Sequence, residues 1–353
     1  MLGKKNKPFF VAEISSNHNG KLSVAKKLIS LAKAGGADAV KLQTYTAKTM
    51  TVNSKKKYFM IRKGLWKGYS LWDLYKKAKT PYNWHKKLFK HAKKIGIKIF
   101  STPFDETAVD FLEKLNCPFY KVSSFEMNDI PLIKKIISTK KPLIISTGTS
   151  SIKEITQVLE EIGRSKFKNL SLLYCVSNYP AKINDFNLYN IKIMKKKFNC
   201  EIGFSDHSTD NVIAAAASKA GATLFEKHIC LKKERGLDYD FSLNEDQIKD
   251  YRNSIDNPSL VINNSKIFTK LLGKKNFTRK NSENISKNYR RSIFTVKKIK
   301  KGEIFTKKNI KRIRPGYGIS ARYFENVLGK VCKRPIDAYE PLTKKFLGKI
   351  DSI

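Results

Sequence analysis

Residues 201–229 have the sequence EIGFSDHSTDNVIAAAASKAGATLFEKHI, in which two short apolar runs flank a segment of small residues. The first run leads to His207 and the second leads to His228. This pattern predicts a strand, a helix and a second strand, and parallel strands end at the same edge of a sheet. The chain has five histidines. Two of them at neighbouring strand ends therefore indicate a candidate metal site.

The same alternation of an apolar run and a helical segment extends from residue 9 to about residue 255. Besides the two runs above, strands are expected at residues 9–14, 39–43, 98–101, 120–122, 143–146 and 170–174. Eight strand–helix units predict an α/β protein with a (β/α)8 TIM barrel. A doubly wound open sheet is the competing fold, but no glycine-rich dinucleotide-binding loop follows the first strand.

The remainder of the chain differs in character from the barrel. Residues 256–290 are polar and poorly periodic, which predicts a linker with some helix. Residues 291–353 contain short strand-like pieces between turn residues, which predicts a small, mostly-β domain. We therefore expect a barrel over residues 1–255, a linker over 256–290 and a second domain over 291–353. So small a domain has little core of its own and should lean on another surface.

The chain carries 71 lysines and arginines against 30 acidic residues, a net charge of +41. The lysines are spread along the sequence, whereas nucleic-acid-binding proteins usually cluster basic residues with aromatic ones. We interpret the charge as a solvated surface and expect no specific nucleic-acid partner. A non-catalytic, basic nucleic-acid-binding protein remains the alternative. The sequence shows neither a signal peptide nor a membrane span, so we expect a cytoplasmic protein with no membrane partner.

Polar residues gather where the predicted strands end, which is where TIM barrels carry their catalytic groups. These residues are Glu13, Lys41, Gln43, Thr102, Lys121, Ser124, Glu126, Ser146, Tyr179, Ser205, His207 and His228. Lysines and hydroxyls suit a phosphate or phosphoenol group. Two histidines with open positions suit Mn²⁺ or Mg²⁺. The two glutamates could act as a general base or hold a hydroxyl, or they could form a structural network with the lysines.

Other features carry weaker predictions. His85 and His91 lie six residues apart on one predicted helix and are expected at the surface. His18 follows the first strand, and its role stays open. The segment 44–80 interrupts the strand–helix rhythm and carries Trp66 and Trp72, which favours a packed lid over a ligand-stacking surface.

The strand ends also carry recognisable motifs: AEISSNHNG, AVKLQTY, IFSTPFD, YKVSSFE, IISTGTS, LLYCVSNYP, IGFSDHS and EKHI. Their succession resembles the sialic acid synthase family, and the C-terminal part resembles the antifreeze-like (SAF) domain that this family carries. The insert IRKGLWKGYSLWDLYKKAKTPYNWH is more similar to the pseudaminic acid synthase branch than to the N-acetylneuraminate or legionaminate branches.

The resemblance implies condensation of phosphoenolpyruvate with an N-acetylated amino sugar. It implies metal ligation by His207 and His228, with Mn²⁺ or Mg²⁺. It implies phosphoenolpyruvate binding by Lys41, Thr102, Lys121, Ser124, Ser146 and Ser205. It implies contacts to the sugar or the reacting centre from Glu13, Gln43, Glu126, Tyr179 and Asp238. Among all of these, Glu13, Lys121 and Glu126 are the expected catalytic residues.

The resemblance also implies that Arg314, in RIRPGYGIS, enters the barrel of a partner subunit in a domain-swapped homodimer. One position departs from the family pattern. Ser177 stands where many sialic acid synthases have asparagine, so the contact from that position is in doubt.

Overall fold

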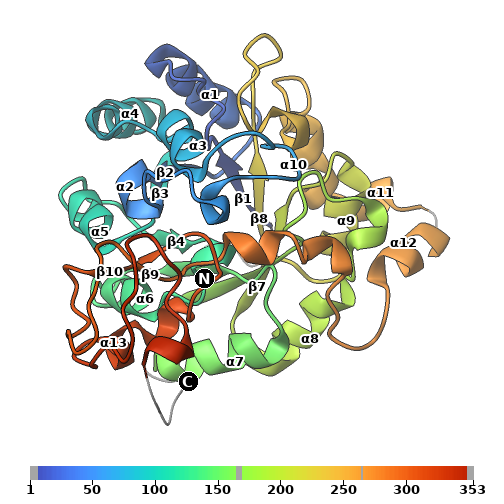
Figure 1. The fold of residues 1–353 in the computed structure, drawn as a ribbon. Helices are drawn as coiled ribbons and strands as arrows, with labels where there is room; N and C mark the ends of the chain where they lie inside the picture. The colour runs from blue at the N-terminus through green and yellow to red at the C-terminus, as the bar shows by residue number, and fades with distance from the viewer. Residues whose placement is uncertain (1–6, 164–168, 264, 348–353) are drawn as a thin grey trace.

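The chain forms a closed barrel whose mouth is covered by an insertion and by a smaller C-terminal unit (Figure 1). The structure is a computed structural model that describes residues 7–163, 169–263 and 265–347. The outer limits of the predicted domains, at residues 1 and 353, lie outside the described residues.

Within the described ranges, eight parallel strands pair in sequence order and β8 returns to β1. The TIM barrel predicted from the sequence is therefore confirmed. Its strands are β1 (Phe9–Glu13), β2 (Ala39–Thr44), β3 (Lys98–Pro103), β4 (Tyr120–Val122), β5 (Leu143–Ser146), β6 (Leu170–Cys175), β7 (Glu201–Asp206) and β8 (Leu224–His228). The helices that follow successive strands are α1 (Leu22–Ala34), α4 (Tyr82–Ile95), α5 (Glu106–Glu113), α6 (Ile130–Ile137), α7 (Ile152–Glu161), α8 (Tyr189–Phe198), α9 (Asn211–Lys219) and α10 (Ile248–Asp256).

The register of the strands brings predicted site residues to one level. Glu13 lies opposite Lys41 on one side and opposite His228 on the other. Ser205 lies opposite Glu226. Side chains alternate between the two faces of a strand, so Glu226 and His228, two residues apart, share a face. The barrel therefore assembles these groups at its C-terminal end without help from the loops.

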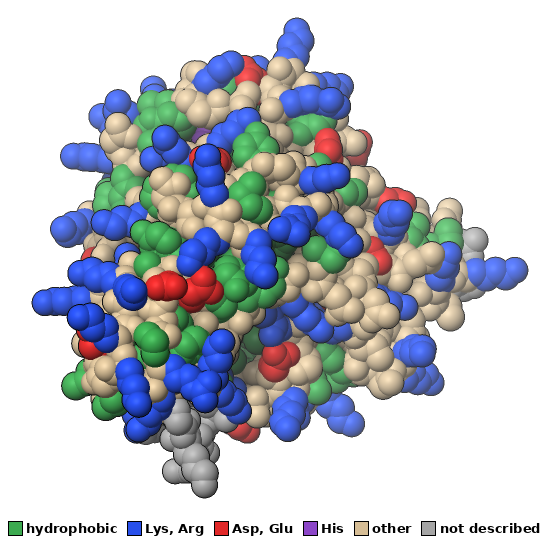
Figure 2. Space-filling model, in the orientation of Figure 1, with side chains coloured by type: hydrophobic (Ala, Val, Ile, Leu, Met, Phe, Trp, Pro, Cys, Tyr) green, Lys and Arg blue, Asp and Glu red, His purple; other side chains and the backbone are tan. Residues whose placement is uncertain are grey.

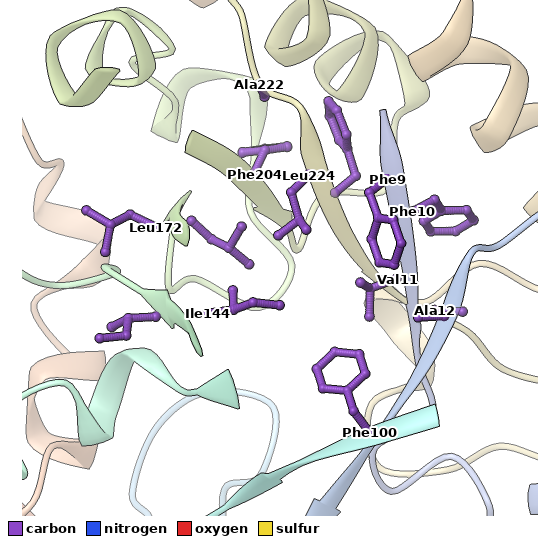
Figure 3. Packing of buried hydrophobic residues seen from close by; sticks show 14 of the residues in the cluster. Phe9, Phe10, Val11, Ala12, Phe100, Ile144, Leu172, Phe204, Ala222 and Leu224 are labelled. Atoms are coloured by element: carbon purple, nitrogen blue, oxygen red, sulfur yellow. The ribbon is translucent and has the colours of Figure 1, made fainter. Parts of the chain in front are cut away.

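Burial explains why the strands are apolar. Phe100, Ile144, Leu172 and Phe204 belong to one cluster of buried side chains (Figure 3). On the helical layer, α9 presents the consecutive alanines 214–217, all fully buried, so this helix can pack closely on the strands. The apolar runs are thus explained by burial on both faces of the strands.

An insertion between β2 and α4 covers part of the mouth. It contains α2 (Ala47–Met50) and α3 (Leu71–Ala78). Met60 forms an antiparallel bridge with Ser70, and we call residues 60–70 the finger loop. Gly64 and Gly68 have φ angles of +86° and +97°, a conformation that glycine adopts without strain. These two glycines let the chain turn so that Trp66 faces the barrel mouth.

The chain after α10 stays close to the barrel. It forms α11 (Pro258–Val261) and α12 (Ser265–Leu272), and we call the following residues, 273–291, the strap. The C-terminal unit has an antiparallel pair, β9 (Ser292–Thr295) and β10 (Ile310–Ile313), and the short helix α13 (Phe324–Val327). It lies beside α5 and α6 (Figure 1), and Arg312 bonds to Glu106 of α5. This small antiparallel sheet agrees with the predicted SAF-type domain.

The expectation that His85 lies at the surface is wrong. His85 is fully buried on α4. Its Nε2 lies 2.8 Å from Oγ1 of Thr44, at the end of β2, and its Nδ1 lies 3.1 Å from the carbonyl oxygen of Pro81. Two polar partners make burial of the ring tolerable, and the rings of Tyr82 and Phe111 pack beside it.

The outside of the molecule is strongly basic. Figure 2 shows lysines and arginines over the whole visible face, with few acidic side chains between them. Within the described part of the chain, no helix is long and apolar enough to cross a membrane.

Candidate active site

A cavity of about 150 Å³ lies at the C-terminal ends of the strands. A single water needs about 10–15 Å³ on this measure, so the cavity has room for a small ligand. Most of the predicted site residues line it: Lys41, Gln43, Lys121, Ser124, Ser146, Tyr179, Ser205, His207, His228, Asp238 and Arg314. Glu13, Thr102 and Glu126 do not line it but bond to residues that do, the first two to Lys41 and the third to Arg314. The sequence therefore predicts residues that come together in space, while their individual roles stay predictions.

Four buried charges form the base of the cavity. Nζ of Lys41 lies 2.5 Å from Glu13 and 3.6 Å from Glu226, and Nζ of Lys121 lies 2.7 Å from Glu226. Thr102 accepts a further hydrogen bond from Lys41. The two lysines and two carboxylates carry opposite charges, and their attraction offsets the free-energy cost of burying them. Sequence reasoning missed Glu226, although its period-two spacing from His228 places it on the inner face.

The surroundings shift the pKa values of these four groups in different directions. Burial raises the pKa of Glu13, and Lys41 only partly opposes this effect. Burial also acts on Glu226, but there Lys121 and Lys41 outweigh it and lower the pKa. Burial lowers the pKa of Lys121, with Glu226 acting against it. Glu13 is therefore the carboxylate of this cluster that is most easily protonated.

The serines of the cavity differ in how firmly they are held. Oγ of Ser124 accepts a hydrogen bond from the backbone N–H of Gly148 at 3.0 Å, and Ser205 donates to Glu226 at 3.2 Å. Oγ of Ser146 is buried and has no hydrogen-bond partner among the described residues. A Cβ at position 148 would lie 2.1 Å from Oγ of Ser177, so only glycine fits at this position of the loop after β5. Because Oγ of Ser146 has no partner among the described residues, its hydroxyl is available to a ligand.

His207 and His228 face each other across the cavity, with ring centroids 5.8 Å apart. Nδ1 of His207 lies 2.9 Å from the carbonyl oxygen of Val176, and a carbonyl can only accept, so Nδ1 carries the proton and Nε2 is free to ligate. Nδ1 of His228 is buried without a hydrogen-bond partner among the described residues. Burial lowers the pKa of His207 to about 4, so the ring is neutral at pH 7.

This donor set fits a divalent ion with open coordination positions. Two neutral imidazoles suit Mn²⁺ better than Mg²⁺. No group of three or more histidine, cysteine or acidic side chains with metal-binding geometry occurs within the described residues. Substrate and water oxygens would have to supply the remaining ligands, as in an open catalytic site.

Asp238 and Gln43 form a polar edge beside the histidines. Oδ2 of Asp238 accepts hydrogen bonds from Ser15 and Ser16 and lies 3.9 Å from Nδ1 of His228. Nε2 of Gln43 donates to Glu13 and Ser15. These side chains are held in place before any ligand arrives, which favours recognition of a hydroxylated or amide-bearing molecule.

Arg314 reaches the mouth of its own barrel. It makes two hydrogen bonds to Glu126, at 2.8 and 2.7 Å, and a third to Tyr75. Within the single chain described, Arg314 bonds to Glu126 of its own barrel, and its supply by a partner subunit in a domain-swapped homodimer stays a prediction. Burial would raise the pKa of Glu126, but Arg314 and Arg291 outweigh it and lower the pKa. As placed, Glu126 holds Arg314.

Comparison with known proteins agrees with this arrangement. The NeuB family model matches residues 28–266, and the SAF domain model matches residues 290–348. The chain is 38% identical over 333 residues to a pseudaminic acid synthase of Campylobacter jejuni subsp. jejuni, covering 94% of each chain. The chain belongs to the NeuB family.

Two further proteins are also similar to this chain. An N,N'-diacetyllegionaminic acid synthase of Campylobacter jejuni subsp. jejuni is 35% identical over 93% of this chain and 96% of its own. The crystal structure of the spore coat polysaccharide biosynthesis protein SpsE from Bacillus subtilis superposes with a TM-score of 0.83 at 31% identity, over 99% of this chain and 97% of that one.

In this NeuB family member, the strap makes contacts that no sequence pattern predicts. The carboxylate of Glu283 is buried and accepts hydrogen bonds from the backbone N–H groups of Thr149, at 3.0 Å, and Ser177, at 2.9 Å. Arg279 donates to the carbonyl oxygens of Thr147 and Cys175, both at 2.6 Å. The strap thus fixes the loops after β5 and β6. Both residues lie in the polar segment 256–290, which has no periodicity to mark them.

Proposed function

We propose that this NeuB family member is a transferase that condenses phosphoenolpyruvate with 2,4-diacetamido-2,4,6-trideoxy-L-altrose, giving pseudaminate and phosphate by C–O cleavage. The observation that carries the proposal is the convergence of two lysines, the three predicted serines (Ser124, Ser146 and Ser205) and two neutral histidines on one cavity. The 38% identity to a pseudaminic acid synthase over nearly the whole chain supports the choice of sugar.

The buried base of the cavity suits the anionic substrate. Lys41 and Lys121 would hold the phosphate and carboxylate of phosphoenolpyruvate, with the free hydroxyl of Ser146 as a further donor. Because the four-charge cluster is already balanced, the added anion favours protonation of Glu13. Glu13 therefore takes up a proton on substrate binding and keeps the site from accumulating negative charge.

His207 and His228 would hold Mn²⁺ or Mg²⁺, which when bound supplies positive charge to polarise the sugar aldehyde. C3 of phosphoenolpyruvate attacks the aldehyde carbon, and positive charge develops at C2. The aldehyde oxygen takes up a proton and becomes a hydroxyl, while water adds to C2 and gives up a proton. The bond between C2 and the phosphate oxygen then breaks, the remaining proton of the added water is lost, and a ketone and inorganic phosphate result. Lys41 and Lys121 keep the phosphate and the carboxylate in place during these steps. Gln43 and Asp238 orient the sugar. The availability of phosphoenolpyruvate inside cells fits a cytoplasmic enzyme.

The test is phosphate release by the purified full-length chain with phosphoenolpyruvate, Mn²⁺ and each of three sugars. We expect release with 2,4-diacetamido-2,4,6-trideoxy-L-altrose and at least about 100-fold less with N-acetylmannosamine or the legionaminate precursor. EDTA should abolish release and Mn²⁺ should restore it. Preference for either other sugar contradicts the substrate, and release that survives EDTA contradicts the metal.

The metal role has a matched pair of variants. His207→Ala should lose at least about 100-fold in kcat and should lose tight Mn²⁺ binding in equilibrium dialysis. His91→Ala, which changes a half-exposed histidine that contacts Ser30, should keep both. Equal behaviour of the two variants contradicts the assignment of His207.

A further inference from the structure

The cavity has two unlike walls. Lysines, serines and histidines from the strand ends line one wall. The insertion between β2 and α4 lines the other with uncharged side chains: Tyr45, Met50, Trp66, Leu74, Tyr75 and Ala78. If phosphoenolpyruvate lies against the strand-end lysines, we expect the sugar to extend from Gln43 and Asp238 toward the insertion. This step rests on the function proposed above.

The polar atoms of two key residues on the uncharged wall are already engaged. The indole N–H of Trp66 donates to the carbonyl oxygen of Leu237 at 3.1 Å. The hydroxyl of Tyr75 lies 3.3 Å from a guanidinium nitrogen of Arg314. Trp66 therefore presents only its ring to a ligand. A hydroxyl group of a ligand placed against that ring would have no partner there.

A single aromatic ring, that of Tyr179, separates Trp66 from the predicted metal ligand His207. Its ring centroid lies 5.7 Å from that of Tyr179, and Tyr179 lies 4.5 Å from His207. The ring of Tyr289, from the strap, lies 6.4 Å away on another side. Trp66 is half-buried and is held by the finger loop, the strap and the loop after β8. A sugar with its aldehyde at His207 would direct its far end toward Trp66.

We propose that Trp66 determines sugar specificity: its ring selects sugars whose terminal carbon, C6, is a methyl group and disfavours those with a C6 hydroxyl. The ligand class is a 6-deoxy, N-acetylated aldose. A methyl group gives up no hydrogen bond when it packs on the indole face. A hydroxyl group gives up its hydrogen bonds to water there and gains none in return. Apolar pockets reject an added hydroxyl by a factor of about 100, so this is the discrimination expected.

The test compares two sugars that differ only at C6, 2,4-diacetamido-2,4,6-trideoxy-L-altrose and 2,4-diacetamido-2,4-dideoxy-L-altrose, by kcat/KM for phosphate release. The wild-type chain should prefer the 6-deoxy sugar about 100-fold. Trp66→Ala should reduce that ratio to below about 10-fold, chiefly by losing activity on the 6-deoxy sugar. Trp66→Leu, which keeps an apolar side chain, should retain more of the preference.

The matched control is Trp72→Ala. Trp72 belongs to the same insertion and is half-buried, but it does not line the cavity. It should leave the ratio unchanged, even if thermal melting shows a similar loss of stability. An unchanged ratio in both Trp66 variants, with an active wild type, overturns the role of Trp66 alone. A wild-type chain that uses N-acetylmannosamine and neither diacetamido sugar overturns the proposed function as well.

Discussion

The strand ends and the cover of the cavity differ in the charges that they carry and in how they are held in place. At the strand ends, Lys41, Lys121 and Glu226 come from short strands whose register fixes them, and their charges balance within the barrel. The cover is made by the finger loop, the strap and Arg314, and it is joined to the barrel by hydrogen bonds between segments far apart in sequence. We therefore propose a division of labour, in which the barrel supplies the charges for the reaction and the added segments position loops and select the sugar.

The largest expected effect concerns Arg314, because its removal leaves the buried Glu126 short of a partner. Arg314→Ala should lower kcat by about 100-fold and destabilise the chain by about 3 kcal/mol. Arg334→Ala, at an exposed site of the same C-terminal unit, should change neither value. Phosphate release and urea unfolding measure the two effects.

A mixing experiment then asks whose barrel Arg314 serves. Lys121→Met and Arg314→Ala chains are each expected to be nearly inactive. If Arg314 serves its own barrel, a mixture refolded together should stay inactive, since no barrel has both residues. Recovery of activity in the mixture would show that Arg314 is supplied by a partner, and it would confirm the domain-swapped homodimer predicted from the sequence.

A smaller effect is expected from the strap. Glu283→Ala leaves the backbone N–H groups of Thr149 and Ser177 buried without an acceptor, which costs about 2 kcal/mol of stability. It should reduce kcat/KM about 10-fold by loosening both loops. Glu283→Gln keeps an acceptor oxygen and should lie closer to wild type, and Glu160→Ala, at the surface of α7, serves as the control. Full activity in Glu283→Ala would mean that the strand-end loops need no strap.

The smallest effect on catalysis is expected from His85, whose protonation makes stability depend on pH and leaves activity at pH 7 unchanged. Burial lowers the pKa of His85 to about 4 from an ordinary value of 6.5. The unfolded chain is therefore protonated first, so stability falls as pH drops from about 6.5 to 4. His85 accounts for about 3 kcal/mol of that loss.

Urea unfolding between pH 7.5 and 4.5 tests this prediction. The slope of stability against pH should be shallower in His85→Gln than in wild type, whereas His91→Gln should keep the wild-type slope. Identical slopes in all three chains would contradict the role of His85.

The barrel could be predicted because its signals are local. Each strand is a short apolar run, and its last polar residues point into the mouth, which located Lys41, Ser146 and His207. The same logic also applies to Glu226, because it precedes His228 by two residues and so shares its face, although the predicted set of site residues does not include it. His85 was misjudged because its burial depends on Thr44, forty-one residues away.

The cover could be predicted only in part. The resemblance to the sialic acid synthase family pointed to Arg314, but no pattern in the sequence tells which barrel it enters. Arg279 and Glu283 lie in a polar, aperiodic segment, and they matter only because the strap crosses the ends of β5 and β6. Such contacts depend on the path of the chain in space, which local periodicity does not record.

The lysine-rich exterior has a kinetic consequence. The charges inside the cavity are already balanced, so the surface charge of Figure 2 adds little to the strength of buried contacts. Its field instead extends about 10 Å into solvent at moderate salt and attracts anions toward the mouth. Raising the ionic strength should therefore slow diffusional encounter with phosphoenolpyruvate, while the rate of the bond-forming step stays the same.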